Sequence, residues 1–98
     1  MDTKKKLSIS QKYNYVILNN EIIFMPILDI DISRAYVFSD DVGKNIAEGV
    51  INHLSIYDII NFICVKYSVD RSEAAKDVRD IVEYLLRMGV IIYDQNKN

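Results

Sequence analysis

The stretch "SRAYVFSDD", residues 33–41, contains the point at which the sequence changes from strand-like to helix-like spacing. Up to Phe38, apolar or aromatic residues fall on both faces of an extended chain, as they would in a strand between covered surfaces. After Phe38 the apolar residues recur at helical spacing, and Ser39 or Asp40 is placed to cap the first N–H groups of a helix. The stretch therefore predicts a short strand over residues 34–38 that runs directly into a helix.

The residues before this stretch predict a β-hairpin. The segments "YNYVIL" and "EIIFMPIL" flank Asn19-Asn20, a dipeptide that tolerates the positive φ of a tight turn. Pro26 lies in the second segment and cannot donate to a ladder, so it indicates a bulge, a strand end or an open edge. Together with residues 34–38, the hairpin predicts a three-stranded antiparallel meander.

The residues after the stretch predict three helices. Helical spacing runs from Val42 to Val50, resumes at Ile56 and resumes again after Asp70. Ser55 with Asp58 and Asp70 with Glu73 are spaced as capping boxes, and Gly89 is placed to end the third helix. The segment "VIIYD" suggests one last short strand. The predicted class is α+β, a winged helix-turn-helix-like arrangement of a three-stranded antiparallel sheet followed by three helices.

The third helix has a broader apolar arc than one buried face requires. At 100° per residue the arc spans about 160°, against the roughly 100° of an ordinary amphipathic helix. Its members are Ala74, Ala75, Val78, Ile81, Val82, Leu85, Leu86 and Met88. Two interpretations are open: burial against two neighbours, or a rim that lines a groove for another chain.

Charge is distributed unevenly along the 98 residues. Lys4, Lys5, Lys6 and Lys12 precede the patterned region, and from residue 13 onward eight basic side chains face thirteen acidic ones, a net charge near −5. A surface for nucleic acid requires the opposite sign, so we expect no nucleic-acid partner. No apolar stretch has the length of a membrane span, so we expect no membrane contact.

The sequence contains no recognisable catalytic or metal-binding arrangement. His53 is the single histidine and lies in an expected turn, while Cys64 is the single cysteine and lies beside an apolar helix stripe. One cysteine allows no internal disulfide, which favours a cytoplasmic protein. The glycines form no phosphate-binding loop. We therefore expect no enzyme, no metal and no cofactor, and a protein that is a monomer or a weak dimer.

Polar and apolar landmarks over residues 14–92 resemble those of one family. They are Phe38-Ser39-Asp40 at the helix start, followed by Ile59, Ile60, Tyr67, Asp70, Glu73, Asp77, Val78, Leu85, Leu86, Gly89, Val90 and Ile91. In this pattern the chain is similar to the PqqD-like family, also called RiPP recognition elements. It departs from the family at "NIA", residues 45–47, where Ile-Trp is common, and at "DIS", where a Gly-Lys or Gly-Arg turn is usual.

The resemblance implies a non-catalytic module that binds the leader of a ribosomally synthesised precursor peptide. In such modules the leader adds as a strand to the third strand and places apolar side chains against the third helix. The implied peptide-binding residues are Arg34, Ala35, Tyr36, Val37, Phe38, Asp77, Val78, Arg79, Ile81 and Val82. The implied boundaries are a flexible basic tail over 1–12, a PqqD-like domain over 13–93 and a C-terminal tail over 94–98. The second implied partner is a peptide-modifying enzyme, such as a leader peptidase or a radical SAM enzyme, in a lasso-peptide or radical-enzyme pathway.

Two other functions fit the same element order. A winged-helix DNA-binding regulator would place basic residues of a helix in the major groove, but acidic residues on the third helix match the basic ones in number. A subunit-interaction domain would use the broad apolar arc for a dimer contact.

Overall fold

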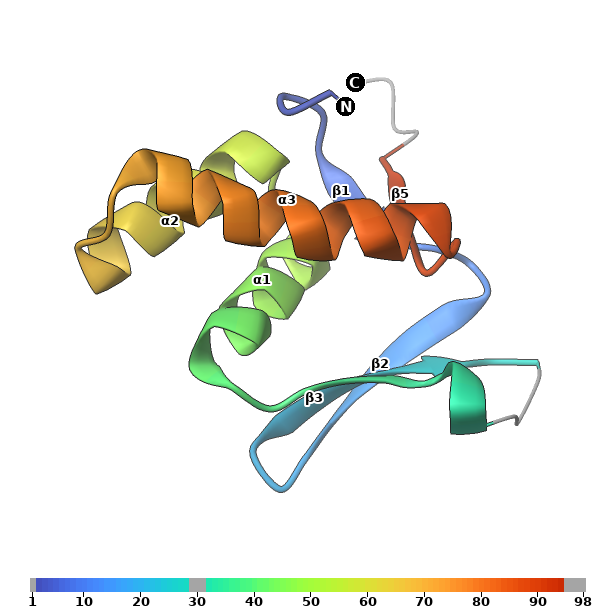
Figure 1. Cartoon of the computed structure of the whole chain (residues 1–98). Helices are drawn as coiled ribbons and strands as arrows, with labels where there is room; N and C mark the ends of the chain where they lie inside the picture. The colour runs from blue at the N-terminus through green and yellow to red at the C-terminus, as the bar shows by residue number, and fades with distance from the viewer. Residues whose placement is uncertain (1, 29–31, 95–98) are drawn as a thin grey trace.

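The computed structural model describes residues 2–28 and 32–94, and it confirms a three-stranded antiparallel sheet followed by three helices (Figure 1). The sheet contains β2 (Tyr13–Leu18), β3 (Glu21–Pro26) and β4 (Tyr36–Phe38), with a 3₁₀ turn, η1 (Ile32–Arg34), before β4. The helices are α1 (Asp41–Ile51), α2 (Ile56–Tyr67) and α3 (Arg71–Arg87). A second, two-stranded sheet pairs β1 (Leu7–Ile9) with β5 (Ile91–Tyr93). None of the described helices is long and apolar enough to cross a membrane.

The main sheet has the order β2-β3-β4, with β3 in the middle. Asn19 and Asn20 have φ values of 52° and 65°, so the predicted tight hairpin is confirmed. The strand β4 is shorter than expected, because Arg34 belongs to the 3₁₀ turn rather than to the strand. Phe24 pairs with Tyr36, and the same register continued by two residues would place Arg34 opposite Pro26. Since Pro26 has no N–H to donate, the ladder ends before that pair.

The helix starts follow the capping signals in two cases out of three. Asp40 caps α1 and its carboxylate accepts a 2.7 Å hydrogen bond from the Gly43 N–H, while Ser55 and Asp58 form the predicted capping box of α2. Asp70 is at the N-cap of α3 but makes no side-chain bond to the helix, so the predicted capping box there is wrong. Its carboxylate accepts instead from the Ser72 hydroxyl at 2.8 Å. This local bond competes with capping.

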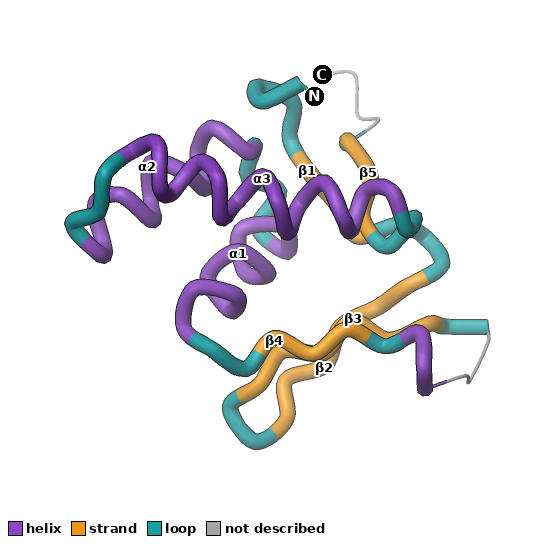
Figure 2. Tube along the Cα trace, in the orientation of Figure 1, coloured by secondary structure: helices purple, strands orange, loops and turns teal. Residues whose placement is uncertain are grey.

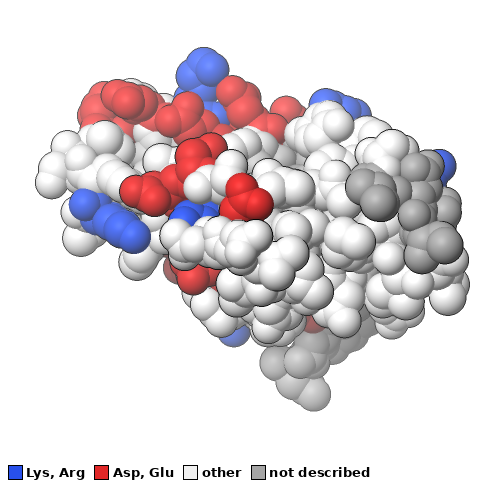
Figure 3. Space-filling model, turned by 90° about the horizontal axis from the view of Figure 1, so that it is seen from below, with Lys and Arg blue, Asp and Glu red and all other residues white. Residues whose placement is uncertain are grey.

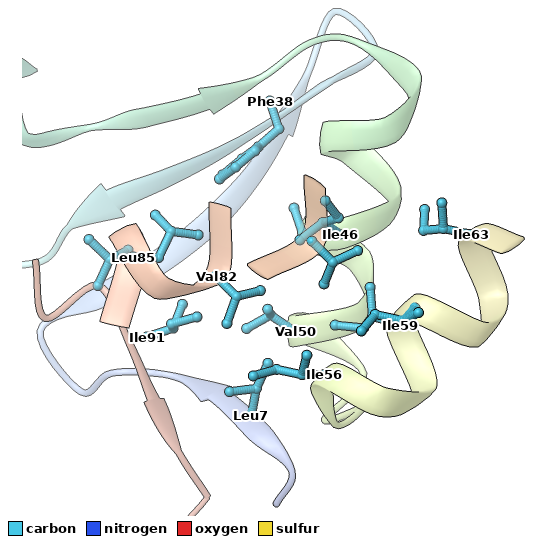
Figure 4. Close-up of a cluster of buried hydrophobic side chains, with 14 of the residues drawn as sticks. Leu7, Phe38, Ile46, Val50, Ile56, Ile59, Ile63, Val82, Leu85 and Ile91 are labelled. Carbon is cyan, nitrogen blue, oxygen red and sulfur yellow. The ribbon is translucent and has the colours of Figure 1, made fainter. Parts of the chain in front are cut away.

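The core lies between the main sheet and the three helices, with side chains from all of them pointing into one cluster (Figure 4). Phe24 and Phe38 meet edge to face with ring centroids 5.0 Å apart. Both rings belong to the buried cluster through which the sheet packs against the helices. From α3 the core receives Ala74, Val78, Val82 and Leu85, each at most 2% exposed. The buried face of α3 therefore holds the sheet in place.

The second sheet corrects the expected N-terminal tail. Residues 7–9 form β1 instead of a flexible segment, and the Leu7 N–H donates to the Leu54 carbonyl at 3.0 Å. Leu7 is fully buried, so its apolar side chain is a physical reason for the chain to fold back here. The last strand suggested by "VIIYD" is present as β5. The C-terminal tail expected over 94–98 lies, apart from Asp94, outside the described residues.

Candidate functional site

A groove of about 510 Å³ lies between the outer side of β4 and α3. Its strand wall consists of Tyr36, Val37 and Phe38, and its helix wall of Asp80, Ile81, Glu83, Tyr84, Leu85 and Arg87. In the main sheet β4 pairs with β3 and with no other strand of the described chain. An edge strand leaves backbone N–H and C=O groups available for one more strand. The groove thus combines a free sheet edge with a helix face.

The middle of the groove is aromatic, with an apolar floor. The rings of Tyr36 and Tyr84 meet at 68° with centroids 6.0 Å apart, which joins the strand wall to the helix wall. Leu85 is only 2% exposed and lies beneath them. Burial, and next the hydrogen bond with Tyr84, raise the pKa of the Tyr36 phenol above its ordinary value of 10.0. The phenol therefore stays neutral near pH 7 and can exchange hydrogen bonds with a ligand.

The rim of the groove is charged and open to water. Asp80 pairs with Lys76 at 3.1 Å, but their side chains are 63% and 75% exposed. An ion pair so exposed contributes about 0–1 kcal/mol, so a charge on a ligand can replace it at little cost. The Arg87 guanidinium lies 5.7 Å from the centre of the Tyr84 ring. This geometry is within the range of a cation–π contact.

The structure divides the residues that the sequence assigned to peptide binding. Tyr36, Val37, Phe38 and Ile81 line the groove. Arg34 and Ala35 precede the strand, with Arg34 exposed and Ala35 half-buried. Val78 and Val82 are fully buried in the core, so neither is accessible to a ligand unless α3 moves, and their assignment is corrected. Asp77 is exposed and lies one turn before Asp80 on the same face of α3. Arg79 borders a second hollow, whose lining includes Thr3.

Sequence reasoning named only one of the six residues that form the helix wall, Ile81. Asp80, Glu83, Tyr84, Leu85 and Arg87 line the groove but were not named as site residues. The residues assigned on α3 begin about one helical turn before the groove, since Tyr36 meets α3 at Tyr84. Tyr84 itself was a usable signal, because it is an aromatic residue at the rim of an apolar arc. Such a position suits a surface that contacts another chain.

One cluster outside the groove contains the residue types of a catalytic triad. The Ser8 hydroxyl lies 3.0 Å from Nδ1 of His53, and a carboxylate oxygen of Asp94 lies 3.9 Å from the same nitrogen. A catalytic triad uses the two ring nitrogens for different partners, one for the nucleophile and one for the carboxylate. His53 is therefore a locally bonded turn histidine, as the sequence indicated. Within residues 2–28 and 32–94, no three His, Cys, Asp or Glu side chains are grouped so that they could hold a metal ion.

Comparison with known proteins supports the fold. No family model matches the sequence, and no curated protein matches it significantly. A solved structure, described as TbiB1 in complex with the TbiA(beta) leader peptide, is similar with a TM-score of 0.73. The two chains are 21% identical, and the match covers 93% of this chain and 99% of the other. The chain therefore shares its fold with a protein seen in complex with a leader peptide, which confirms the fold that the family resemblance implied.

Proposed function

We propose that this chain is a non-catalytic recognition module that binds the leader of a ribosomally synthesised precursor peptide by β-strand addition. The observation that carries the proposal is the groove, in which a free edge of β4 faces α3. The shared fold with a leader-peptide complex supports it. The leader would form a fourth strand beside β4, and its modification would take place on another protein.

The two walls of the groove would contribute differently to binding. Backbone groups of β4 provide hydrogen bonds that any extended peptide can use, each worth about 0.5–1.5 kcal/mol. Every second side chain of the added strand would face the groove and contact Tyr36, Tyr84 and the floor at Leu85. Because β4 has only three residues, the generic part of the affinity is small. Selectivity would then depend on the side chains that meet α3.

The module would act with a peptide-modifying enzyme to which it delivers the bound precursor. A leader peptidase of a lasso-peptide pathway and a radical SAM enzyme are the two classes that the family resemblance suggests. We place the encounter in the cytoplasm, where a precursor made by ribosomes is available, and expect a monomer or weak dimer. The genes beside the coding sequence would identify the enzyme and the precursor.

Titration with the leader encoded beside this gene tests the proposal. We expect a dissociation constant of micromolar or lower, which is about −8 kcal/mol or more favourable. The largest amide shifts should fall on residues 36–38 and 80–87, which line the groove. Shifts centred on α2, or no saturable binding by a verified cognate leader, would refute the proposal.

A winged-helix DNA-binding function is less well supported. Such a protein would need a basic helix face toward the phosphates. On α3 the basic Arg71, Lys76, Arg79 and Arg87 are matched in number by the acidic Glu73, Asp77, Asp80 and Glu83. At about 0.15 M salt we expect no duplex binding tighter than the ordinary non-specific 10⁻⁴ to 10⁻⁶ M. A sequence-dependent nanomolar gel shift would favour the regulator instead.

A further inference from the structure

We infer that the groove binds peptides selectively according to the order of their charged residues. A bound segment would carry a basic residue, then an apolar or aromatic anchor, then an acidic residue, in the direction of the chain. The inference rests on the proposed function and specifies the class of peptide for that same site. It follows from a polarity that the two walls of the groove share.

The helix wall is acidic over most of its length and basic at its end. Of the charged residues that line the groove, Asp80 and Glu83 come first along α3 and Arg87 comes last. Lys76 offsets part of this charge through its exposed pair with Asp80. Two acidic groups of the groove therefore precede the cation of the last turn. A peptide lying along α3 meets negative charge first and positive charge last.

The residues that flank the strand wall have the reverse order of charge along the chain, basic before β4 and acidic after it. Arg34 stands just before β4, and its charge is close enough to the Tyr36 phenol to lower the pKa of that group, against the larger effect of burial. Asp40 and Asp41 follow β4 and are exposed. Asp40 is partly engaged as the cap of α1, while Asp41 occupies the first turn of that helix. In Figure 3 most acidic side chains lie in the left half, on the side where α1 begins in Figure 1, and basic side chains lie among them.

The directions of β4 and α3 place like charges of the two walls together. In Figure 2 β4 runs from η1 at the right toward α1 at the left, and α3 crosses above it in the opposite direction. The contact of Tyr36 with Tyr84 fixes the alignment at the start of β4. Arg87 therefore lies at the end of the groove toward Arg34, which precedes β4, and Asp80 lies toward the end at which Asp40 follows β4. A strand added antiparallel to β4, as β3 is on its other side, would enter at the acidic end.

The spacing of the charges suits an extended peptide. Asp80 and Arg87 are separated along the helix axis by about 10 Å, at 1.5 Å per residue. Side chains on one face of a strand recur every ~6.6 Å, so the positions two before and two after an anchor are about 13 Å apart. Lys, Arg and Glu side chains can span the small difference. With the anchor at Tyr84, the flanking charges reach Asp80 and Arg87.

Selection from a library of random displayed peptides tests the inference, because it requires no known precursor. Peptides retained by the wild-type protein should show Lys or Arg two positions before an apolar or aromatic residue, and Asp or Glu two positions after it. The variant Asp80→Lys/Arg87→Glu should select the opposite order. The control Glu73→Lys/Arg79→Glu makes the same exchange at exposed positions of α3 that do not line the groove, and it should select the wild-type order.

A synthetic pair gives the magnitude of the effect. A selected peptide should bind at low salt about fivefold or more tightly than the same peptide with its two charges exchanged, because two exposed pairs change from attraction to repulsion. The difference should nearly vanish at 1 M salt, where the screening length is about 3 Å.

The possible failures are distinguishable. Retained peptides without charge order, or with the reverse order, would overturn the inference and leave strand addition intact. Failure to retain any peptide whose binding depends on Tyr84 would overturn the proposed function together with the inference.

Discussion

The main sheet has two edges in the part of the chain that the structure describes, and they differ in what lies beside them. The edge strand β2 has six residues, and Val16, Ile17 and Leu18 on it are 47–67% exposed. The edge strand β4 has three residues, and α3 stands along its outer side. Both edges offer the same kind of backbone groups. Under the proposed function, the binding edge is the one to which a second element adds a wall, although its strand is the shorter of the two.

The largest expected effect is a loss of stability when the buried side chain under the groove is shortened. Leu85→Ala should lower the free energy of unfolding by about 2–5 kcal/mol, because it removes a side chain that is 2% exposed under the β4 edge. Chemical denaturation of the two proteins measures the difference. Met88→Ala is the control on the same helix, since Met88 is 51% exposed and should cost less than about 1 kcal/mol. Equal losses for the two variants would mean that the groove has no packed floor.

The second prediction compares a tyrosine beside each edge. Tyr84, beside β4, and Tyr15, on β2, are 43% and 40% exposed, so their removal exposes similar surfaces. Tyr84→Ala should weaken leader binding about 10- to 30-fold, as expected for an aromatic residue at the centre of an interface. Tyr15→Ala should change the dissociation constant less than twofold. Calorimetric titration of both variants decides between the edges, and the opposite ranking would move the site to β2.

The third prediction concerns the backbone of the ligand. In an antiparallel pair only every second residue donates its N–H to a given neighbour. Single N-methylations along the leader should therefore weaken binding about two- to tenfold at alternate positions, through the lost hydrogen bond. Amide exchange in β4 should slow on binding, while exchange in β2 should not change. A uniform response along the leader would exclude strand addition at either edge.

Local patterns predicted the elements well because each signal acts within a few residues. Asn19-Asn20 supplied the positive φ of the hairpin, and Ser55 supplied the cap of α2. Leu7 was missed because its burial depends on Leu54 and β5, which lie far away in the sequence. The apparent extension of the strand to Arg34 had a similar cause, since Pro26 ends the ladder from the neighbouring strand.

The groove was predictable in kind but not in position. The broad arc of α3 left open whether the helix packs on two neighbours or lines a groove, and an arc does not say which residues face the sheet. Val78 and Val82 fill the core, and Ile81 and Tyr84 face the groove. That division depends on where β4 crosses α3. The crossing point is a tertiary contact between Tyr36 and Tyr84, and no local pattern says which residue of the strand meets which residue of the helix.

The smallest expected effect comes from one matched pair of substitutions, and it compares the edges most directly. Ile17 on β2 is 67% exposed and Val37 on β4 is 54% exposed. Threonine at either position keeps the β-branch that suits a strand, so each variant should unfold within about 0.5 kcal/mol of the wild type. Val37→Thr should nevertheless weaken leader binding about two- to fivefold, because Val37 lines the groove and an apolar contact would be lost there. Ile17→Thr should leave the dissociation constant unchanged, since Ile17 borders a different hollow, between the hairpin and α1. Because neither change disturbs the fold, a loss of affinity in the Ile17 variant alone could only mean that the peptide lies along β2.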